Sequence, residues 1–562
     1  MRIVRAAACA ALATMLAACA GVPTSGPIEQ GPAVVGQGED QLIRVLARPP
    51  TAGMEPDEVV RGFQQATASV DTGFDIARQY LTIAASAGWD PGAGVAVYAN
   101  PGLTYTTKGQ VVSAEGALSG SIDGSGQYTV AAPGTPLLAA YGVARVDAEW
   151  RISSLPQGLV LAPGDIDRGF RSFNLHFFTQ DFSTLVPAPV TVPVSAAGLP
   201  TLFVRGLLAG ATSWIAPAVR TAFPEGTRLA LDSVPVVDGV AEVALTDAVL
   251  QADDATRQAL SAQLTWTLRQ LPEITGVRMT VSGQPIVVPG AGPVQPVDSW
   301  ATYDPKVLPD VATAFAIDGR GLVSIDAQGQ LAPVGRTTPD LLLPAVSMDS
   351  ARVAGLSTER SSLWEARLAG GQQATRRYVG AELSRPSWDR LGGVWVVDRG
   401  KGLVLVRGSL VTQVPVMGLP KGVADQDLLA VAVARDGARV ALLVRRGTRV
   451  EPMVARLEST AEVVRVSAPQ RIESVVTEAL DLAWQDADTL LVLGRSGASS
   501  LEVLSLAVGG SRLRRTSAPE GALTLAAGPG RATLIGTKAV LFRNGGTTWS
   551  RLADGIDPVY PG

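Results

Sequence analysis

The chain has 562 residues, of which 46% are hydrophobic and 17% are charged, and its formal net charge is −4. This length suits three or four folded domains with real cores, and the composition is that of a folded protein. Because no basic stripe is present, nucleic acid is not an expected partner.

The start of the chain has the parts of a bacterial export signal. Arg2 and Arg5 give a positive beginning, residues 6–16 are apolar, and small residues lead into a cysteine. The apolar stretch is too short to span a bilayer, which needs about 20 residues. The sequence "LAAC" at 16–19 resembles the lipobox of bacterial lipoproteins. We therefore expect a signal peptide at 1–18 and cleavage between Ala18 and Cys19.

Cys19 is the expected site of lipidation. In lipoproteins, the cysteine sulfur carries a diacylglyceryl group, and a second acyl chain such as palmitate on the freed amine makes membrane attachment stable. The alternative is an ordinary secretory signal followed by an unmodified Cys19. The other cysteine, Cys9, leaves with the signal peptide. The mature chain therefore has no disulfide and no thiolate metal site.

A tether and an α+β domain are expected next. Residues 19–42 are rich in Pro and Gly without an apolar period, which is typical of an extended tether. The first domain, expected at 43–182, begins with a helix near Pro56 and continues with a second helix over 73–85, "GFDIARQYLTIAA". Alternating strands follow, so this is an α+β domain, and by analogy it resembles the NTF2-like fold of nuclear transport factor 2.

A second small α+β domain is expected at 183–292. Phe203 and Leu207 lie one helical turn apart before Gly210, a suitable C-cap residue. A leucine stripe in "TRQALSAQLTWTLRQL" predicts an amphipathic helix with a polar back. The pair Asp238-Gly239 between two apolar runs indicates a tight hairpin.

From residue 300 to 562 the pattern is all-β and repetitive. Five similar stretches each place a turn before an apolar strand, and the turns are 40 to 49 residues apart. This period predicts a β-propeller of five to seven blades. The alternative is a pair of β-sandwiches with chance similarity. The equivalent turn positions are Asp349, Asp389, Asp436, Gln485 and Pro529.

Few residues point to chemistry. The single histidine, His176 in "FNLHFFTQDF", is expected to be a packed strand residue. Without a second histidine or a mature thiol, zinc sites and Cys-His catalysis lack their groups, and no Gly-x-Ser-x-Gly elbow is present. The Asp-x-Asp pairs at 165/167, 425/427 and 486/488 do not continue into a calcium loop. We therefore assign no catalytic, cofactor-binding or metal-binding residues. A glycosidase pair of carboxylates leaves no sequence trace and stays open.

The tryptophans of the all-β region are the other candidates. We expect most of them to fill gaps between blades and one or two to face a rim loop, where tryptophan often anchors a partner. These residues are Trp364, Trp388, Trp395, Trp484 and Trp549.

Several stretches, in this order, resemble the LpqB lipoproteins of actinobacteria. They include "CAGVPTSGPI", "PDEVVRGFQQA", "EWRISSLPQGL" and "FNLHFFTQD". The stretch "LTWTLRQLPEITGVRMTVSGQPI" resembles the GerMN domain of spore-germination and cell-envelope proteins. The resemblance implies a helix-then-sheet domain, a GerMN-like α+β domain and a propeller, in this order.

The resemblance also implies a function. LpqB lipoproteins are non-enzymatic accessory proteins, anchored by lipid to the cell membrane on its extracytoplasmic face, and are associated with the MtrA/MtrB two-component system. By this resemblance, the protein binds the extracellular part of an MtrB-like sensor histidine kinase and modulates signalling for envelope homeostasis and division. The alternative is an envelope glycan-binding protein or hydrolase that uses the central face of the propeller.

Overall fold

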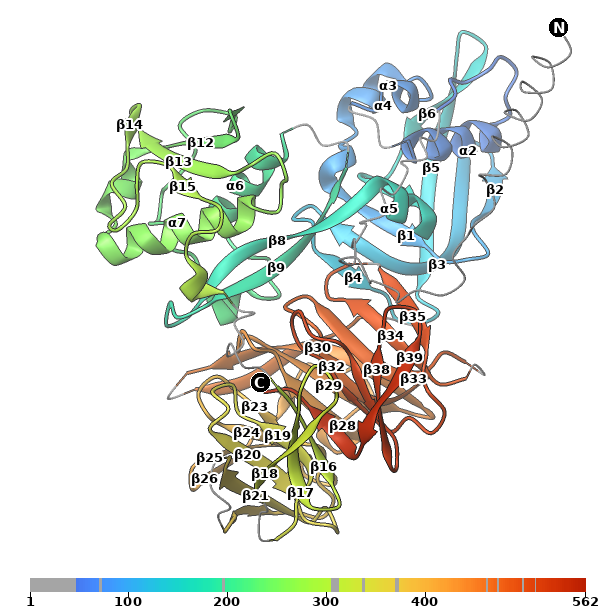
Figure 1. The fold of residues 1–562 in the computed structure, drawn as a ribbon. Coiled ribbons are helices and arrows are strands. Elements are labelled where there is room, and N and C mark those ends of the chain that lie inside the picture. Colours follow the sequence, from blue (N-terminus) through green and yellow to red (C-terminus); the bar gives the residue numbers. More distant parts are fainter. Residues whose placement is uncertain are drawn as a thin grey trace, which may run out of the picture. The chain divides into compact units, whose positions relative to one another are not determined.

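The computed structural model describes the chain from residue 47 onward with short gaps. The described ranges are 47–69, 73–194, 198–304, 313–335, 339–368, 373–460, 463–472, 475–497, 500–510 and 512–562. Val45–Gly562 form one compact unit, drawn from blue to red along the sequence in Figure 1. The signal peptide, Cys19 and the tether expected at 19–42 lie outside the described residues. No helix in these ranges is long and apolar enough to cross a membrane.

The first domain packs helices against a curved sheet that is antiparallel except where β7 pairs with β1 (Figure 1). Helix α2 begins as expected, with Pro56 in its first turn and the Glu58 carboxylate accepting the Glu55 N–H at 2.9 Å. Its buried side covers the sheet in the order β6-β5-β3-β1-β7. The elements are α2 Pro56–Thr67, α3 Asp75–Arg78, α4 Ile83–Gly88, β1 Gly94–Tyr98, β2 Thr104–Lys108, β3 Val111–Asp123, β4 Tyr128–Val130, β5 Pro136–Val146, β6 Glu149–Ser154, β7 Leu159–Leu161 and α5 Pro163–Gly169.

The single second helix predicted over 73–85 is wrong. Two short helices, α3 and α4, replace it, because Leu81 bridges to Ile152 in the sheet. Thr82 then starts α4, with its hydroxyl accepting the Ala85 N–H at 3.2 Å. Pairing with the sheet therefore outweighs the helical period at this point.

The second domain begins with a long β-hairpin, whose first strand was expected to belong to the first domain. Strands β8 (Phe170–Thr179) and β9 (Leu185–Pro193) pair along their length and form one sheet with β10 (Val219–Arg220). The domain boundary expected between 182 and 183 falls in the turn of this hairpin. The strand pattern of the preceding sheet continues into β8 after only the short helix α5, so the sequence showed no boundary before Phe170.

The remainder of this domain is a βαβ unit. β12 and β13 run parallel, with α7 between them in sequence, and β11 joins β12 through Asp238 and Gly239, both at positive φ, as the hairpin pattern predicts. Gly210 ends α6 as expected. The elements are α6 Leu199–Ala209, β11 Val236–Val237, β12 Val240–Leu245, α7 Asp254–Leu268, β13 Gly276–Val281, β14 Gln284–Pro285 and β15 Gln295–Pro296.

The polar back predicted for α7 is wrong. Ten consecutive residues, Ala259 to Leu268, are buried, so the helix is enclosed on all sides after its first turn. Its polar side chains are satisfied internally. Gln263 Oε1 accepts the Ala222 N–H at 2.8 Å, and Thr267 Oγ1 accepts the N–H of His176 at 3.0 Å. Hydrogen bonds therefore allow polar residues to lie where the sequence pattern indicated a solvent-exposed face.

Within its described residues, the all-β region forms six four-stranded blades, in the range of five to seven that the repeats indicated. In Figure 1 they run from yellow to red. The first blade has β16 Ala314–Asp318, β17 Gly321–Ile325 and β18 Leu331–Gly335, with β40 Ile556–Val559 as inner strand. The second blade has β19 Leu342–Val346, β20 Arg352–Leu356, β21 Ser362–Arg367 and β22 Thr375–Val379, and the third has β23 Ser387–Trp388, β24 Val394–Asp398, β25 Gly402–Arg407 and β26 Leu410–Gln413. The fourth has β28 Leu428–Val433, β29 Arg439–Arg446, β30 Arg449–Ser459 and β31 Val464–Arg471, and the fifth has β32 Glu478–Trp484, β33 Thr489–Arg495, β34 Glu502–Ala507 and β35 Leu513–Ser517. The sixth has β36 Thr524–Ala526, β37 Leu534–Gly536, β38 Val540–Asn544 and β39 Trp549–Asp554. A short β27, Val416–Met417, pairs with β31.

The ring is closed by strands from opposite ends of the region. β40 pairs antiparallel with β16, so the first blade contains the last strand of the chain. The inner strands contact one another in a complete circle, β40-β19-β23-β28-β32-β36-β40. The five turns that we aligned in the sequence each join the first and second strands of blades two to six. The first blade escaped the repeat pattern because its inner strand comes from the far end of the chain.

The second domain and the propeller share a core. One apolar cluster runs from the domain around α7 into the fourth and fifth blades. Trp214 is held on both sides: its Nε1 donates to the Ala468 carbonyl at 2.8 Å, and its own carbonyl accepts from Arg456 at 2.7 Å. Asn174 Nδ2 donates to Asp488 Oδ2 at 2.6 Å. The hairpin therefore connects the domains through packing as well as through the chain.

Candidate functional site

The expected lipidation residue and cleavage site, Cys19 and Ala18, lie outside the described residues, so both stay predictions. His176 is buried on β8, edge-on to Trp266 with 5.8 Å between ring centroids. This placement supports the expectation of a packed strand residue.

The Asp-x-Asp pairs cap turns and helix ends. Asp165 and Asp427 accept the N–H groups of Ala162 and Ala424 at 3.0 and 2.9 Å. Burial and the adjacent Asp488 raise the pKa of Asp486 to about 6. In the part of the chain that the structure describes, no cluster of three or more His, Cys, Asp or Glu side chains could hold a metal ion.

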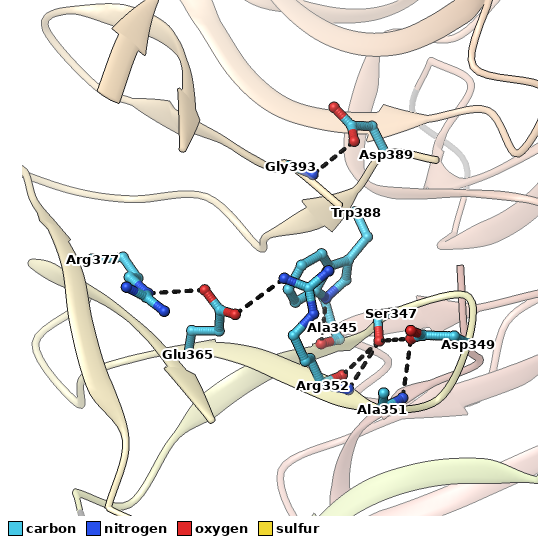
Figure 2. A network of polar contacts seen from close by, with 10 residues as sticks. All are labelled: Ala345, Ser347, Asp349, Ala351, Arg352, Glu365, Arg377, Trp388, Asp389 and Gly393. Carbon is cyan, nitrogen blue, oxygen red and sulfur yellow. Dashed lines mark hydrogen bonds and ion pairs between the residues drawn. The ribbon is translucent and has the colours of Figure 1, made fainter. Parts of the chain in front are cut away.

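A polar network joins the second and third blades (Figure 2). Trp388 at the end of β23 donates from Nε1 to the Ala345 carbonyl of β19 at 2.9 Å. The Arg352 guanidinium lies over the Trp388 ring, 4.5 Å from its centroid, and pairs with Glu365 at 3.3 Å. Glu365 also binds Arg377 at 2.9 Å. Trp388 and Arg352 thus connect the second blade to the third.

Hydrogen bonds also stabilise the turn between β19 and β20, which Figure 2 shows beside this network. Asp349 accepts from the Ser347 hydroxyl and from the Ala351 N–H, and the hydroxyl bond is the main reason that its pKa lies below the usual range. In the next blade, Asp389 Oδ1 accepts the Gly393 N–H at 2.7 Å. The aligned aspartates are therefore turn residues with a structural task.

The fourth and fifth blades repeat the arrangement in a buried form. Trp484 Nε1 donates to the Ala432 carbonyl at 3.0 Å, and Arg439 lies 5.4 Å from the Trp484 ring centroid. Arg439 binds Asp436 through Nε at 3.0 Å and also donates to the Ala487 carbonyl. The side chains of Arg439 and Asp436 are 0% and 1% exposed. Arg439, paired with Asp436 in its own blade, therefore connects the fourth blade to the fifth away from solvent.

The sixth and first blades form a third such pair. Tyr560, directly after β40, occupies the aromatic position and donates its hydroxyl to the Ala532 carbonyl at 2.8 Å. Burial raises the pKa of Tyr560 to about 12, against the opposing effect of Arg531 and Arg543. An aromatic residue thus joins alternate blade pairs around the ring.

The centre of the ring holds a second set of buried charges. Arg385 Nη1 donates to the carbonyls of Leu525 and Pro558 at 3.2 and 3.3 Å and lies 3.9 Å from Asp481. Asp481 accepts the Leu525 N–H at 2.8 Å, and burial raises its pKa although Arg385 opposes the shift. Burial likewise lowers the pKa of Arg435 to about 10. These groups tie several blades together at the axis.

The central cavity is small. Inner-strand residues of all six blades line it, and its volume is about 80 Å³. Sites for small molecules usually measure about 300–1,000 Å³. The central cavity therefore has room for a few waters but not for a sugar ring with its substituents.

The tryptophans mostly have structural positions. Trp388, Trp395 and Trp484 are buried, as expected for residues between blades. Trp364 and Trp549 are half-buried, and Trp549 Nε1 donates to the Ser517 carbonyl at 2.7 Å. The arginines that stack on the tryptophans were not among the residues predicted from the sequence. The signal was present as the shared "ARVA" at 351–354 and 438–441.

Comparison with known proteins assigns the family. Three family profiles match in chain order: "Lipoprotein LpqB, N-terminal domain" over 49–167, "Sporulation and spore germination" over 174–287, and "Lipoprotein LpqB beta-propeller domain" over 321–561. The Lipoprotein LpqB of Thermobifida fusca is 31% identical and aligns over 100% of this chain and 99% of its own length. This chain belongs to the lipoprotein LpqB family.

Other LpqB proteins agree over the same length. The Lipoprotein LpqB of Mycobacterium tuberculosis is 27% identical over 98% of both chains. The profile boundaries also place β8 with the second domain, as the sheet pairing does. The resemblance found in the sequence motifs is therefore confirmed, and so is the order of two α+β domains and a propeller.

Solved structures match only in parts. TolB from Acinetobacter baumannii is similar over 44% of this chain and 66% of its own, with 15% identity and a TM-score of 0.33. The first GerMN domain of the sporulation protein GerM from Bacillus subtilis covers 22% of this chain and 92% of its own, with 20% identity and a TM-score of 0.18. These TM-scores are too low for any property of the two proteins to be inferred for this chain.

Proposed function

We propose that this LpqB-family protein is a lipid-anchored accessory protein on the extracytoplasmic face of the cell membrane. Cys19 is its anchor, carrying diacylglycerol and palmitate. The protein binds the extracellular part of an MtrB-like sensor histidine kinase and modulates two-component signalling for envelope homeostasis and division. It acts by binding rather than by catalysis.

The observation that carries the proposal is how the propeller uses its buried polar groups. The arginine, aspartate and tryptophan side chains described above bind neighbouring blades, and both oxygens of Asp481 accept backbone N–H groups. Groups engaged in this way give a rigid scaffold, and rigidity lowers the entropy cost of binding a partner. Lipid anchoring adds a high effective concentration near membrane proteins.

The shared core between the second domain and the propeller decides how the proposal is tested. A cut near residue 295 would expose apolar surface that is now buried between the two domains. Binding is therefore measured with the whole soluble chain, residues 20–562, against the extracellular domain of the kinase from the same bacterium.

Exposed apolar side chains supply the surface variants. Serine replaces Ile83 and Leu138 in the first domain, Leu231 and Val287 in the second, or Leu410 in the propeller, all of which are exposed. Loss of a central apolar anchor usually costs 2 kcal/mol or more, or about 30-fold in affinity. The variants control for one another, because each leaves the other two domains unchanged. Kinase autophosphorylation in vesicles should change with the wild-type protein and less with the weakened variant.

A further inference from the structure

A pocket between the sixth and first blades differs from the central cavity in size. Its volume is about 330 Å³, which lies in the range of small-molecule sites. Ile325, Leu534 and Leu552 give it apolar walls, while Arg531, Arg543 and Tyr560 give it polar groups. The pocket thus combines an apolar body with two cations.

The turn of the sixth blade lacks the aspartate that the second, third and fourth blades have at the aligned position. In the fourth blade, the turn aspartate Asp436 pairs directly with Arg439. In the sixth blade the aligned turn residue is Pro529, so Arg531 has no carboxylate from its own turn. Arg531 is exposed, and within the described ranges no hydrogen bond or ion pair of its guanidinium is present.

The second cation is only partly engaged. Arg543 donates from Nη1 to the neutral carbonyl of Ala327. The pocket has one carboxylate, Asp326, and its Oδ1 accepts the N–H groups of Gln328 and Gln330 at 2.9 and 2.8 Å. Asp326 therefore caps its own turn, and no ion pair joins it to either arginine in the described residues.

We propose that this pocket binds a small organic carboxylate. The anionic head lies between Arg531 and Arg543, and the apolar part contacts Ile325, Leu534 and Leu552. Because the pocket lies where the last and first blades meet, an occupied pocket also holds the ring closed.

The test is a ligand-observed NMR titration of the soluble chain, residues 20–562, with sodium hexanoate, acetate, hexanamide and inorganic phosphate. Hexanoate should bind most tightly, because acetate lacks the apolar part and hexanamide lacks the charge. Arg531→Gln and Arg543→Gln should each weaken hexanoate binding at least about tenfold, since a charge-assisted hydrogen bond contributes about 1.5–3 kcal/mol. Arg514→Gln, an exposed arginine on β35, is the matched control and should bind as the wild type does.

The outcomes separate the proposal from its alternatives. Because Arg531 is exposed, Arg531→Gln should keep the wild-type melting temperature, so its loss of binding cannot come from misfolding. Hexanoate binding that survives in both variants would overturn the proposal, as would equal binding of hexanoate and hexanamide. Binding of phosphate without hexanoate would assign the pocket to a different ligand class.

Discussion

The buried pair Arg439 and Asp436 gives the sharpest stability prediction, because the second blade offers a control with the same local sequence. Arg439→Met keeps most of the side-chain volume but leaves Asp436 buried without its cation. Removing one partner of a buried ion pair costs about 3–5 kcal/mol. The equivalent Arg352 is 35% exposed and pairs with Glu365. Arg352→Met should therefore lose only a screened ion pair and a stacking contact, about 1–2 kcal/mol together.

Calorimetry of the soluble chain measures this difference. For a domain of about the size of the propeller, a change of about 1 kcal/mol in the free energy of unfolding shifts the melting temperature by about 2–4 °C. Arg439→Met should lower the propeller transition by about 10 °C, and Arg352→Met by about 3–5 °C. The double variant Asp436→Asn with Arg439→Met should recover part of the loss, because no buried charge remains. Equal melting-temperature shifts for Arg439→Met and Arg352→Met would contradict this prediction. So would a shift of the double variant that equals the sum of the shifts of Asp436→Asn and Arg439→Met alone.

Three further predictions follow from other sites. Cys19→Ser should release the protein from the membrane, and a variant that still partitions with detergent would exclude the lipid anchor. The neutral form of Tyr560 is favoured in the fold, with a pKa of about 12, so its contribution to stability is present below pH 10 and is lost as the pH rises to 12. The melting temperature of the wild type should consequently fall more steeply over this range than that of Tyr560→Phe. Gly509→Ala should lower the melting temperature more than Gly408→Ala, because both have positive φ but only the first would place a Cβ 2.3 Å from Pro189.

The periodic features of the fold could be predicted from the sequence. The turn positions recur at the blade period, because every blade repeats the same strand and turn requirements. Gly210 and Asp238-Gly239 were predictable because a helix end and a tight hairpin need local conformations that few residues adopt. Pro56 likewise marked the start of α2.

The features that depend on distant partners could not be predicted. The polar residues of α7 look solvent-exposed in sequence, and only the hydrogen bonds of Gln263 and Thr267 to other elements explain their burial. Arg352 and Arg439 have the same local sequence but different exposure, because neighbouring blades surround them differently. The pocket at Arg531 depends on β40, which joins the first blade from the far end of the chain.

A binding isotherm shows whether this protein acts by binding a sensor kinase. Soluble residues 20–562 are titrated with the extracellular domain of the MtrB-like kinase at physiological salt. If the proposed function holds, binding is saturable, is weakened by serine substitution on one domain's exposed apolar surface, and is unchanged by Arg514→Gln. An absence of binding up to high micromolar concentration, with both proteins folded, would contradict it.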